Sequence, residues 1–435
     1  MRPAKAKGGA DGMTAATGMR AKIWRVVQVA SGNFLEMYDF MVFGYYAGAI
    51  GRTFFPTDSE FASLMLTLMT FGAGFLMRPL GAILLGAYID HHGRRAGLLL
   101  TLALMALGMV LISALPGYAT LGLFAPLLVV LGRLLQGFSA GVELGGVSVY
   151  LSEIAPPGQR GLYVAWQSAS LNLAVVAAAA IGVTLHAALP LAEVEAWGWR
   201  IPMLIGCLII PALLLLRRGL TETEAFAARR HHPTVRDILR GVATHWRIVL
   251  LGMLMVTISN AAFYLLTAYT PTFGSAVLHL SSRDALLVTL CVGITNVVFV
   301  PLGGALSDRV GRRPVMLAAA ALILLAAYPL LSWLAAAPSL TRMLEVEETL
   351  AVFYALYNGA MIVHVTEIMP FEVRTAGFSL AYSLSQTLFG GFTPAICTYL
   401  IHLSGNPAIP GAWLSFAALL AIGALLAFPR LSPRP

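Results

Sequence analysis

The stretch Gly86-Ala-Tyr-Ile-Asp90-His-His-Gly93-Arg94-Arg95 occurs twice in this chain, each time between two long apolar runs. Its second copy, Gly304-Ala-Leu-Ser-Asp308-Arg-Val-Gly311-Arg312-Arg313, follows about half a chain length later. A second motif repeats at nearly the same offset, as Glu153-Ile-Ala-Pro156-Pro-Gly-Gln-Arg160 and Glu367-Ile-Met-Pro370-Phe-Glu-Val-Arg374. Two different motifs that repeat at nearly one offset indicate that the second half duplicates the first.

The composition predicts a membrane protein. The chain is 58% hydrophobic and only 11% charged, with a mean hydropathy of +0.81, whereas a soluble protein carries about 25% charged residues. Its apolar runs are long enough to cross a bilayer, which takes roughly 20 residues. The three cysteines, Cys207, Cys291 and Cys397, all lie inside these runs. We therefore expect them to be packing residues rather than a disulfide set or a metal site.

The apolar runs predict an all-α membrane protein with twelve transmembrane helices in two six-helix bundles. The predicted spans are 26–50, 61–86, 96–115, 121–148, 162–187, 199–217, 247–273, 284–306, 314–335, 347–369, 375–402 and 409–428. The first bundle then covers residues 23–217 and the second covers 247–429, with a linker over 218–246. Residues 1–22, rich in Gly, Ala, Lys and Arg, are predicted to be a disordered tail, and 430–435 a second short tail.

The basic residues predict the orientation in the membrane. An even number of spans places both termini on one side, and the tails and loops of that side hold most of the 28 Lys and Arg. The loops of the opposite side hold only Arg52, Arg200, Arg283 and Arg342. Because cytoplasmic loops carry the excess of positive charge, both termini are expected in the cytoplasm. The net charge of +8 is therefore a topology signal, and no nucleic-acid partner is expected.

The repeated loop joins two spans at the predicted cytoplasmic surface in each half. Its glycine permits a tight turn, and its aspartate can pair with the following arginines and with a neighbouring helix end. A plain loop anchored by positive charge is the alternative. Because both copies occupy corresponding places, we predict a cytoplasmic gate that opens when the bundles rock apart. The predicted gate residues are Asp90, Arg94, Arg95, Glu153, Arg160, Asp308, Arg312, Arg313, Glu367 and Arg374.

These motifs resemble those of the major facilitator superfamily, a family of transporters. Its signature, Gly-x-x-x-Asp-x-x-Gly-Arg-Arg/Lys, matches residues 86–95 and, more weakly, 304–313. The stretch Arg133-Leu-Leu-Gln136-Gly137 also matches the superfamily's fourth-helix pattern. The Gly-Pro pattern that drug antiporters carry in the fifth helix is absent from residues 162–187, which disfavours an exporter.

Three further stretches are similar to the metabolite–proton symporter family within that superfamily. They are Ser31-Gly-Asn-Phe-Leu-Glu-Met-Tyr-Asp-Phe40, Gly74-Phe-Leu-Met-Arg-Pro-Leu-Gly81 and Leu134-Leu-Gln-Gly-Phe-Ser-Ala-Gly-Val-Glu-Leu-Gly-Gly146. Over residues 24–431 the chain resembles the bacterial citrate–proton symporters and their tricarballylate-transporting relatives. The resemblance implies import of citrate or a related tricarboxylate across the bacterial inner membrane. Another small organic acid, such as a dicarboxylate or a shikimate-like acid, or a zwitterionic osmolyte, is the alternative substrate.

Four charged residues of the first half lie inside predicted spans, where charge is costly and usually functional. Helix rise places Asp39 roughly 20 Å and Arg133 roughly 18 Å into their spans, near the midplane where such proteins bind substrate. Arg78 lies closer to the cytoplasm. Two guanidinium groups facing one cavity suit a polycarboxylate, because each can form two parallel hydrogen bonds with a carboxylate. The alternatives are an ion pair of Arg133 with Asp39 or Glu36, and snorkelling of Arg78 to the cytoplasmic surface.

Glu36 and Asp39 are one helical turn apart and therefore share a helix face. Partial burial and mutual repulsion favour protonation of one of them, whereas nearby Arg133 favours its charged form. Competition between proton and substrate for this arginine is sufficient to couple their movement. Asp39 is the predicted proton carrier, Glu36 is the second candidate, and Glu143 is a possible exit relay or a plain ion-pair partner. Carboxylates can serve either ion, so sodium stays an alternative coupling ion.

The remaining predicted cavity residues are neutral and polar. Hydrogen bonding between helices is the alternative role for them. Together with Arg78 and Arg133, the predicted substrate-binding residues are Asn33, Tyr38, Gln136, Gln167, Asn260, Tyr264, Tyr357, Asn358, Tyr382 and Gln386. We expect no cofactor, metal site or catalytic constellation, and hence no enzyme. The expected partners are a small-molecule carboxylate and the lipid bilayer, and the expected oligomeric state is a monomer.

Overall fold

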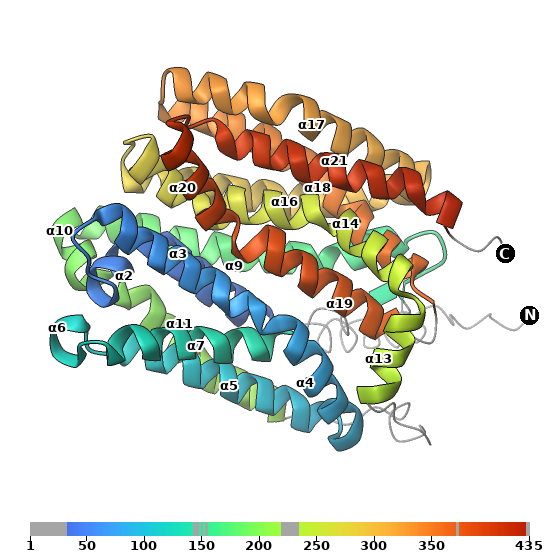
Figure 1. The fold of residues 1–435 in the computed structure, drawn as a ribbon, viewed down its shortest axis with the longest axis horizontal. Coiled ribbons are helices and arrows are strands. Elements are labelled where there is room, and N and C mark those ends of the chain that lie inside the picture. Colours follow the sequence, from blue (N-terminus) through green and yellow to red (C-terminus); the bar gives the residue numbers. More distant parts are fainter. Residues whose placement is uncertain are drawn as a thin grey trace, which may run out of the picture.

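The computed structural model describes residues 33–141, 148, 151–152, 155–218, 235–370 and 374–431. Helices make up nearly all of this part of the chain, and no strand occurs in it. The long helices run side by side in roughly one direction (Figure 1). We call the end of the molecule that carries the two repeated turns, at Gly93 and Gly311, the repeat end. The opposite end, which carries α2, α6 and α10, is the vestibule end.

Helices form most of the described part of the first half, which ends with α11 at Arg218. Residues 33–45 form the first helix, and the elements after it are α2 (Ala47–Phe54), α3 (Glu60–Leu76), α4 (Arg78–His92), α5 (Arg94–Ala114), α6 (Tyr118–Leu121), α7 (Phe124–Ala140), α9 (Arg160–Ala188), α10 (Leu191–Glu193), the π-helical η1 (Val194–Gly198) and α11 (Arg200–Arg218).

The described part of the second half begins with a short helix at Val235 and contains three π-helical segments. Its elements are α13 (Val235–Thr244), α14 (Trp246–Tyr264), η2 (Leu265–Tyr269), α15 (Thr270–Thr272), η3 (Phe273–Val277), α16 (Ser282–Val310), α17 (Arg312–Ala336), α18 (Leu340–Ile368), α19 (Arg374–Gln386), η5 (Thr387–Gly391), α20 (Thr393–Ser404) and α21 (Ile409–Leu431).

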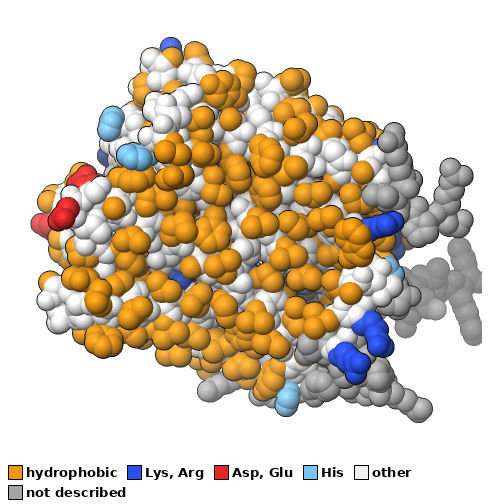
Figure 2. Space-filling model, viewed as in Figure 1, with side chains coloured by type: hydrophobic (Ala, Val, Ile, Leu, Met, Phe, Trp, Pro, Cys, Tyr) orange, Lys and Arg blue, Asp and Glu red, His pale blue; other side chains and the backbone are white. Residues whose placement is uncertain are grey.

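The outer surface is apolar, as a lipid-facing surface must be. Among the described residues, seven helical stretches are long and apolar enough to cross a membrane, and an eighth consists of Leu191–Gly198 and Arg200–Leu215, bent by 46°. Leu99–Ala114 and Phe124–Ala140 are shorter apolar helices. Hydrophobic side chains cover the middle of the molecule, whereas Asp and Glu gather at the vestibule end and Lys and Arg mostly at the repeat end (Figure 2). In water such an apolar surface would aggregate; in a bilayer it is stable.

Span ten is longer than predicted. Helix α18 begins at Leu340 rather than at 347, because Ser339 caps it by accepting a hydrogen bond from the backbone N–H of Arg342 at 3.2 Å. A serine at this position satisfies one of the free N–H groups of the first turn. The extension places Glu347 and Glu348 inside the helix.

The two halves meet most closely along helices α9 and α16. A Cβ atom on Gly161 of α9 would lie only 2.4 Å from the carbonyl oxygen of Gly304 on α16, so only glycine allows this approach. At the repeat end, α4 of the first half also packs against α19 of the second. The repeat end is therefore closed between the two halves.

Candidate functional site

The four predicted intramembrane charges come together as two buried ion pairs. Nη1 of Arg133 lies 2.7 Å from Oδ2 of Asp39, and Nη2 of Arg78 lies 2.7 Å from Oε1 of Glu36. All four residues are buried, and Arg133 has no exposed surface at all. Arg133 thus forms the ion pair that the sequence left open as an alternative. Arg78 points into the protein and does not snorkel to the surface.

Helix packing brings these charges to one place. Glu36 and Asp39 lie one turn apart on the helix over residues 33–45. Helix α7 can bring Arg133 close because a Cβ atom on Gly137 would lie 1.6 Å from the carbonyl oxygen of Gly74 on α3. Arg78 is the first residue of α4, directly after a break that separates α4 from α3. Pro79, which follows, lacks the N–H that a continuous helix would use.

Aromatic rings contact both arginines. The centroid of the Phe40 ring lies 5.0 Å from the Cζ atom of Arg78 and 5.2 Å from that of Arg133. Arg78 also lies 4.4 Å from the ring centroid of Phe75, and Arg133 lies 3.7 Å from that of Phe43. The ring faces attract the cations, and in a desolvated site each contact contributes about 2 kcal/mol.

Arg78 links this cluster to the second half of the chain. Its Nη1 donates a hydrogen bond to Oε1 of Gln386 at 2.8 Å, and Nε2 of Gln386 donates to the hydroxyl of Tyr264, also at 2.8 Å. Nearby, the Thr387 hydroxyl donates to the carbonyl oxygen of Phe75 at 2.7 Å. Tyr264 directly precedes η2 and Gln386 directly precedes η5; π-helical turns of this kind are frequent at functional sites.

The cluster has hydrogen-bonding capacity that the protein does not use. Nη1 of Arg133 donates to Asp39 and to Oε1 of Gln136, at 2.7 and 2.8 Å. In the described part of the chain, however, Nε and Nη2 of Arg133 and Nε2 of Gln136 have no partner. A buried donor without a partner costs about 1–3 kcal/mol. These donors suit an oxygen-rich anion.

Most of the other predicted substrate-binding residues form hydrogen bonds within their own half. The Tyr38 hydroxyl donates to the Pro202 carbonyl oxygen at 2.7 Å, and that of Tyr357 to the Met255 carbonyl oxygen at 2.6 Å. These bonds correspond to the alternative role, contacts between helices. Three more of the predicted residues also contact their own half. Asn260 Nδ2 donates to Ser385 Oγ at 3.2 Å, and Gln167 accepts a hydrogen bond from Ser148. Tyr382 stacks on Phe378, with ring centroids 5.9 Å apart.

Two predicted amides are buried with unused polar atoms. Both polar atoms of the Asn33 side chain, and Nδ2 of Asn358, have no partner among the described residues. Asn33 lies three residues before Glu36 on the first helix, and Asn358 lies in α18. Glu143, the candidate exit relay, lies outside the described residues.

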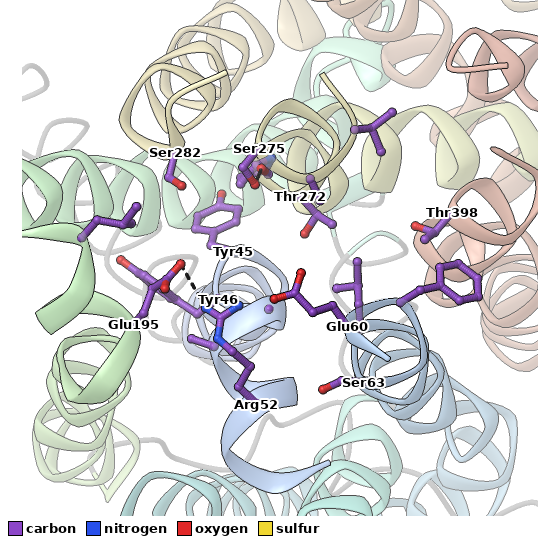
Figure 3. Close-up of a pocket in the computed structure, with 18 of the residues that line it drawn as sticks. Tyr45, Tyr46, Arg52, Glu60, Ser63, Glu195, Thr272, Ser275, Ser282 and Thr398 are labelled. Atoms are coloured by element: carbon purple, nitrogen blue, oxygen red, sulfur yellow. Dashed lines mark hydrogen bonds and ion pairs between the residues drawn. The ribbon is translucent and has the colours of Figure 1, made fainter. Parts of the chain in front are cut away.

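A cavity of about 600 Å³ opens at the vestibule end between the two halves. Tyr45, Tyr46, Arg52 and Glu195 from the first half and Thr272 from the second point into it (Figure 3). An ion pair joins Arg52 to Glu195, with 3.0 Å between Nη2 and Oε1. Tyr45 follows Asp39 by six residues, which corresponds to roughly 9 Å of helix. The cavity therefore leads toward the buried charge cluster. The four charged residues of that cluster do not line the cavity themselves.

The second copy of the repeated loop connects both halves at the repeat end. The carboxylate of Asp308 accepts hydrogen bonds from the backbone N–H groups of Gly161 and Leu162, at 2.9 and 3.0 Å. These groups open helix α9 of the first half, where a negative charge is favourable. Arg312 Nη1 lies 2.5 Å from the same carboxylate, and its Nη2 lies 3.4 Å from Oε1 of Glu367.

The first copy has the same backbone turn as the second. Gly93 has φ 96° and Gly311 has φ 102°, values that strongly favour glycine. The side chains of Asp90, Arg94, Arg95 and Glu153 lie outside the described part of the structure. The other predicted gate residues lie at this same end: Arg160 begins α9 and is exposed, Arg313 is half-buried in α17, and Arg374 begins α19.

One buried carboxyl was missed by the sequence reasoning. Glu347 is only 3% exposed and lies 2.7 Å from the hydroxyl of Thr270 on span seven. The sequence placed it at the boundary of span ten, where a charge needs no explanation. The signal that could have revealed it is the helix-capping Ser339 that follows Pro338.

Known proteins with similar sequences are transporters. The chain is 55% identical to the citrate-proton symporter of Salmonella typhi over 96% of this chain and 97% of that protein. It is 57% identical to the citrate-proton symporter of Klebsiella pneumoniae, over 94% and 92% of the two chains. The alpha-ketoglutarate permease of Escherichia coli (strain K12) is 30% identical, over 96% and 95%.

The fold also matches solved structures. The crystal structure of a D-xylose-proton symporter superposes with a TM-score of 0.75 and 19% identity, over 94% of this chain and 98% of the other. The family model of the Major Facilitator Superfamily matches residues 29–344 and 278–435. The fold is thus an all-α membrane fold of two helical bundles, and the chain belongs to the Major Facilitator Superfamily.

Proposed function

We propose that the protein is a proton-coupled importer of citrate or a related tricarboxylate that works by alternating access. The observation that carries this proposal is the pair of buried arginines, each neutralised by a carboxylate of the first helix. The 55% and 57% identity to citrate-proton symporters supports it, as does the absence of a carboxylate partner for two of the Arg133 nitrogen atoms in the described structure.

The conformation fits the first step of import if the repeat end faces the cytoplasm. The concentration of Lys and Arg at that end supports this orientation. With it, both termini are cytoplasmic, the vestibule opens to the outside of the bacterial inner membrane, and the contacts of Asp308 and Arg312 close the inner gate. The tricarboxylate then enters through the vestibule while the repeat end stays sealed.

Proton and substrate compete for the same arginines. Removing one partner of a buried ion pair costs about 3–5 kcal/mol, because the other charge is left uncompensated. Asp39 can therefore leave Arg133 only when it is protonated and a substrate carboxylate takes its place. Glu36 and Arg78 can undergo the same exchange. A substrate anion thus binds together with protons, which is the requirement for symport.

Binding at Arg78 connects the site to the movement of the two bundles. Arg78 belongs to the first bundle and its hydrogen-bond partner Gln386 to the second. A substrate that engages Arg78 competes for this bond and changes the contact between bundles. We propose that this exchange allows the vestibule to close and the repeat end to open. A single chain contains both bundles, so a monomer suffices for this cycle.

Uptake of labelled citrate into proteoliposomes tests this function. We expect an imposed gradient, acidic outside, to drive accumulation with or without sodium. Uptake that ignores the pH gradient and requires sodium would refute proton coupling. Competition by unlabelled tricarballylate, α-ketoglutarate and glycine betaine ranks the substrates, and the two buried arginines predict that only the polycarboxylates compete. Strong competition by the zwitterion would contradict the assignment of an anionic substrate.

A further inference from the structure

Glu347 is a buried carboxyl in the second bundle that the proposed cycle does not use. It lies on α18, is 3% exposed, and is not one of the ion-pair carboxylates of the central cluster. Among the described residues, no Lys, Arg or His forms an ion pair with it. A carboxylate without a cation inside a membrane-spanning bundle is strongly disfavoured, so this group requires its own explanation.

The two contacts of the Thr270 hydroxyl are compatible with a protonated Glu347. Oγ1 of Thr270 lies 3.2 Å from the carbonyl oxygen of Leu265 and 2.7 Å from Oε2 of Glu347. A hydroxyl has one hydrogen to donate. If Thr270 donates it to Leu265, the second contact needs a hydrogen from Glu347, and a carboxyl carries one only in its acid form. Both contacts are satisfied when Glu347 is protonated.

Within the described part of the chain, Glu348 is the charged group that acts on Glu347, and no cation pairs with it. The titratable groups on the elements packed around this part of α18 are Tyr269 of η2, Cys291 of α16 and Glu348. Glu348 accepts a hydrogen bond from the Thr295 hydroxyl at 2.5 Å. The arginines in the first turns of α18 and α16 are directed elsewhere: Arg342 donates to the Trp333 carbonyl oxygen at 3.1 Å, and Arg283 is exposed.

Thr270 is buried directly before the segment that lines this side of the vestibule. It lies between two π-helical segments, η2 (Leu265–Tyr269) and η3 (Phe273–Val277). The residues that follow it, including Thr272 and Ser275, point into the cavity (Figure 3). The hydrogen bond from Thr270 to the Leu265 carbonyl spans the wide turn of η2. A change in that bond alters the segment that forms this side of the vestibule.

We propose that Glu347 is a second proton-binding carboxyl, whose protonation sets the conformation of span seven at the vestibule. When Glu347 releases its proton to vestibule water, the carboxylate accepts the Thr270 hydrogen. The Leu265 carbonyl oxygen then loses that donor, and the wide turn of span seven loosens. This site is separate from the central charge cluster, and its behaviour does not depend on which acid the protein transports.

Infrared spectroscopy of the full-length protein in lipid tests the protonation state directly. We expect the C=O stretching band of a protonated carboxyl at neutral pH to lose intensity in the Glu347→Gln variant. The neighbouring Glu348→Gln variant is the matched control. In this variant the C=O band of protonated Glu347 should keep its intensity. Thr270→Val, which removes the hydroxyl, should shift the frequency of the band. Equal protonated-carboxyl intensity in wild type and Glu347→Gln overturns the proposal.

Thiol labelling without substrate tests the consequence for span seven. A Thr272→Cys reporter is introduced after the three native cysteines are replaced by alanine. We expect its labelling rate, corrected for thiolate content, to rise several-fold as the pH is raised, and to become independent of pH with Glu347→Gln added. Thr270→Val provides a second variant that should abolish the response if Glu347→Gln does not fold. A pH response that persists in either folded variant overturns the proposal, whatever the outcome of the citrate experiment.

Discussion

Replacing Arg78 by lysine should separate its two roles. Arg78 uses two different nitrogen atoms, Nη2 toward Glu36 at 2.7 Å and Nη1 toward Gln386 at 2.8 Å. A guanidinium holds both partners in a fixed fork, whereas lysine presents one compact charge. We expect Arg78→Lys to keep the ion pair with Glu36 and to lose the hydrogen bond to the second bundle.

The loss of the bond to Gln386 should lower the Tm, because that bond joins the two bundles. The effect on citrate affinity follows from a different bond, since lysine cannot form the two parallel hydrogen bonds that a guanidinium forms with a carboxylate. A hydrogen bond to a charged group contributes about 1.5–3 kcal/mol, which corresponds to about 10- to 150-fold in an equilibrium constant. We therefore expect the Kd for citrate, measured by calorimetry on purified protein, to rise at least about tenfold.

The matched control is Arg52→Lys at the surface. Arg52 pairs with Glu195, but their side chains are 48% and 44% exposed, and exposed pairs contribute about 0–1 kcal/mol. We expect little change in Tm or citrate affinity. An Arg78→Lys protein that binds citrate as tightly as wild type would refute the assignment of Arg78 as a bridge between substrate and the second bundle.

Three further substitutions test the coupling, the gate and the helix packing. Asp39→Asn should abolish accumulation driven by a pH gradient while citrate exchange across the membrane persists; proton-driven uptake at the wild-type rate would exclude Asp39 as the carrier. Asp308→Asn should weaken the contact with the start of α9 by about 1 kcal/mol, which increases labelling of cysteines placed on the repeat-end side; unchanged accessibility would argue against a gate. Gly137→Ala places a Cβ atom 1.6 Å from a backbone oxygen of α3 and should lower stability by about 1–3 kcal/mol or prevent folding. Gly423→Ala, whose Cβ meets nothing within 4 Å, is its control and should leave the Tm unchanged or higher.

The sequence was sufficient for the parts of the fold that follow from single residues and local patterns. Apolar runs predicted most of the long helices, although not the break at Met77 inside the predicted span 61–86. The repeated glycine predicted the two turns, because a positive φ strongly favours that residue. The four buried charges of the first bundle could be found because each one is expensive in a membrane. Which carboxylate pairs with which arginine could not be predicted, because Glu36 and Asp39 lie so close along the helix that either could reach either arginine.

The contacts that depend on tertiary packing were beyond sequence reasoning. Nothing in the local pattern distinguishes Tyr38, whose hydroxyl bonds to the Pro202 carbonyl, from Tyr264, which reaches the central cluster through Gln386. Both are tyrosines on the polar face of a span. The π-helical turns beside Tyr264 and Gln386 also arise from packing between helices rather than from propensity. Glu347 was missed because the error in one helix boundary moved it from the interior of a span to its edge.

The ring of Phe40 has a consequence for the selection of substrate. Its centroid lies 5.0 Å from Cζ of Arg78 and 5.2 Å from Cζ of Arg133, so one aromatic side chain contacts both cations. A ligand that engages both arginines must carry at least two anionic groups. A monocarboxylate can satisfy only one arginine and leaves the other dependent on its own acid. The number of carboxylates on a ligand is thus the property by which two neighbouring cations distinguish polycarboxylates from monocarboxylates.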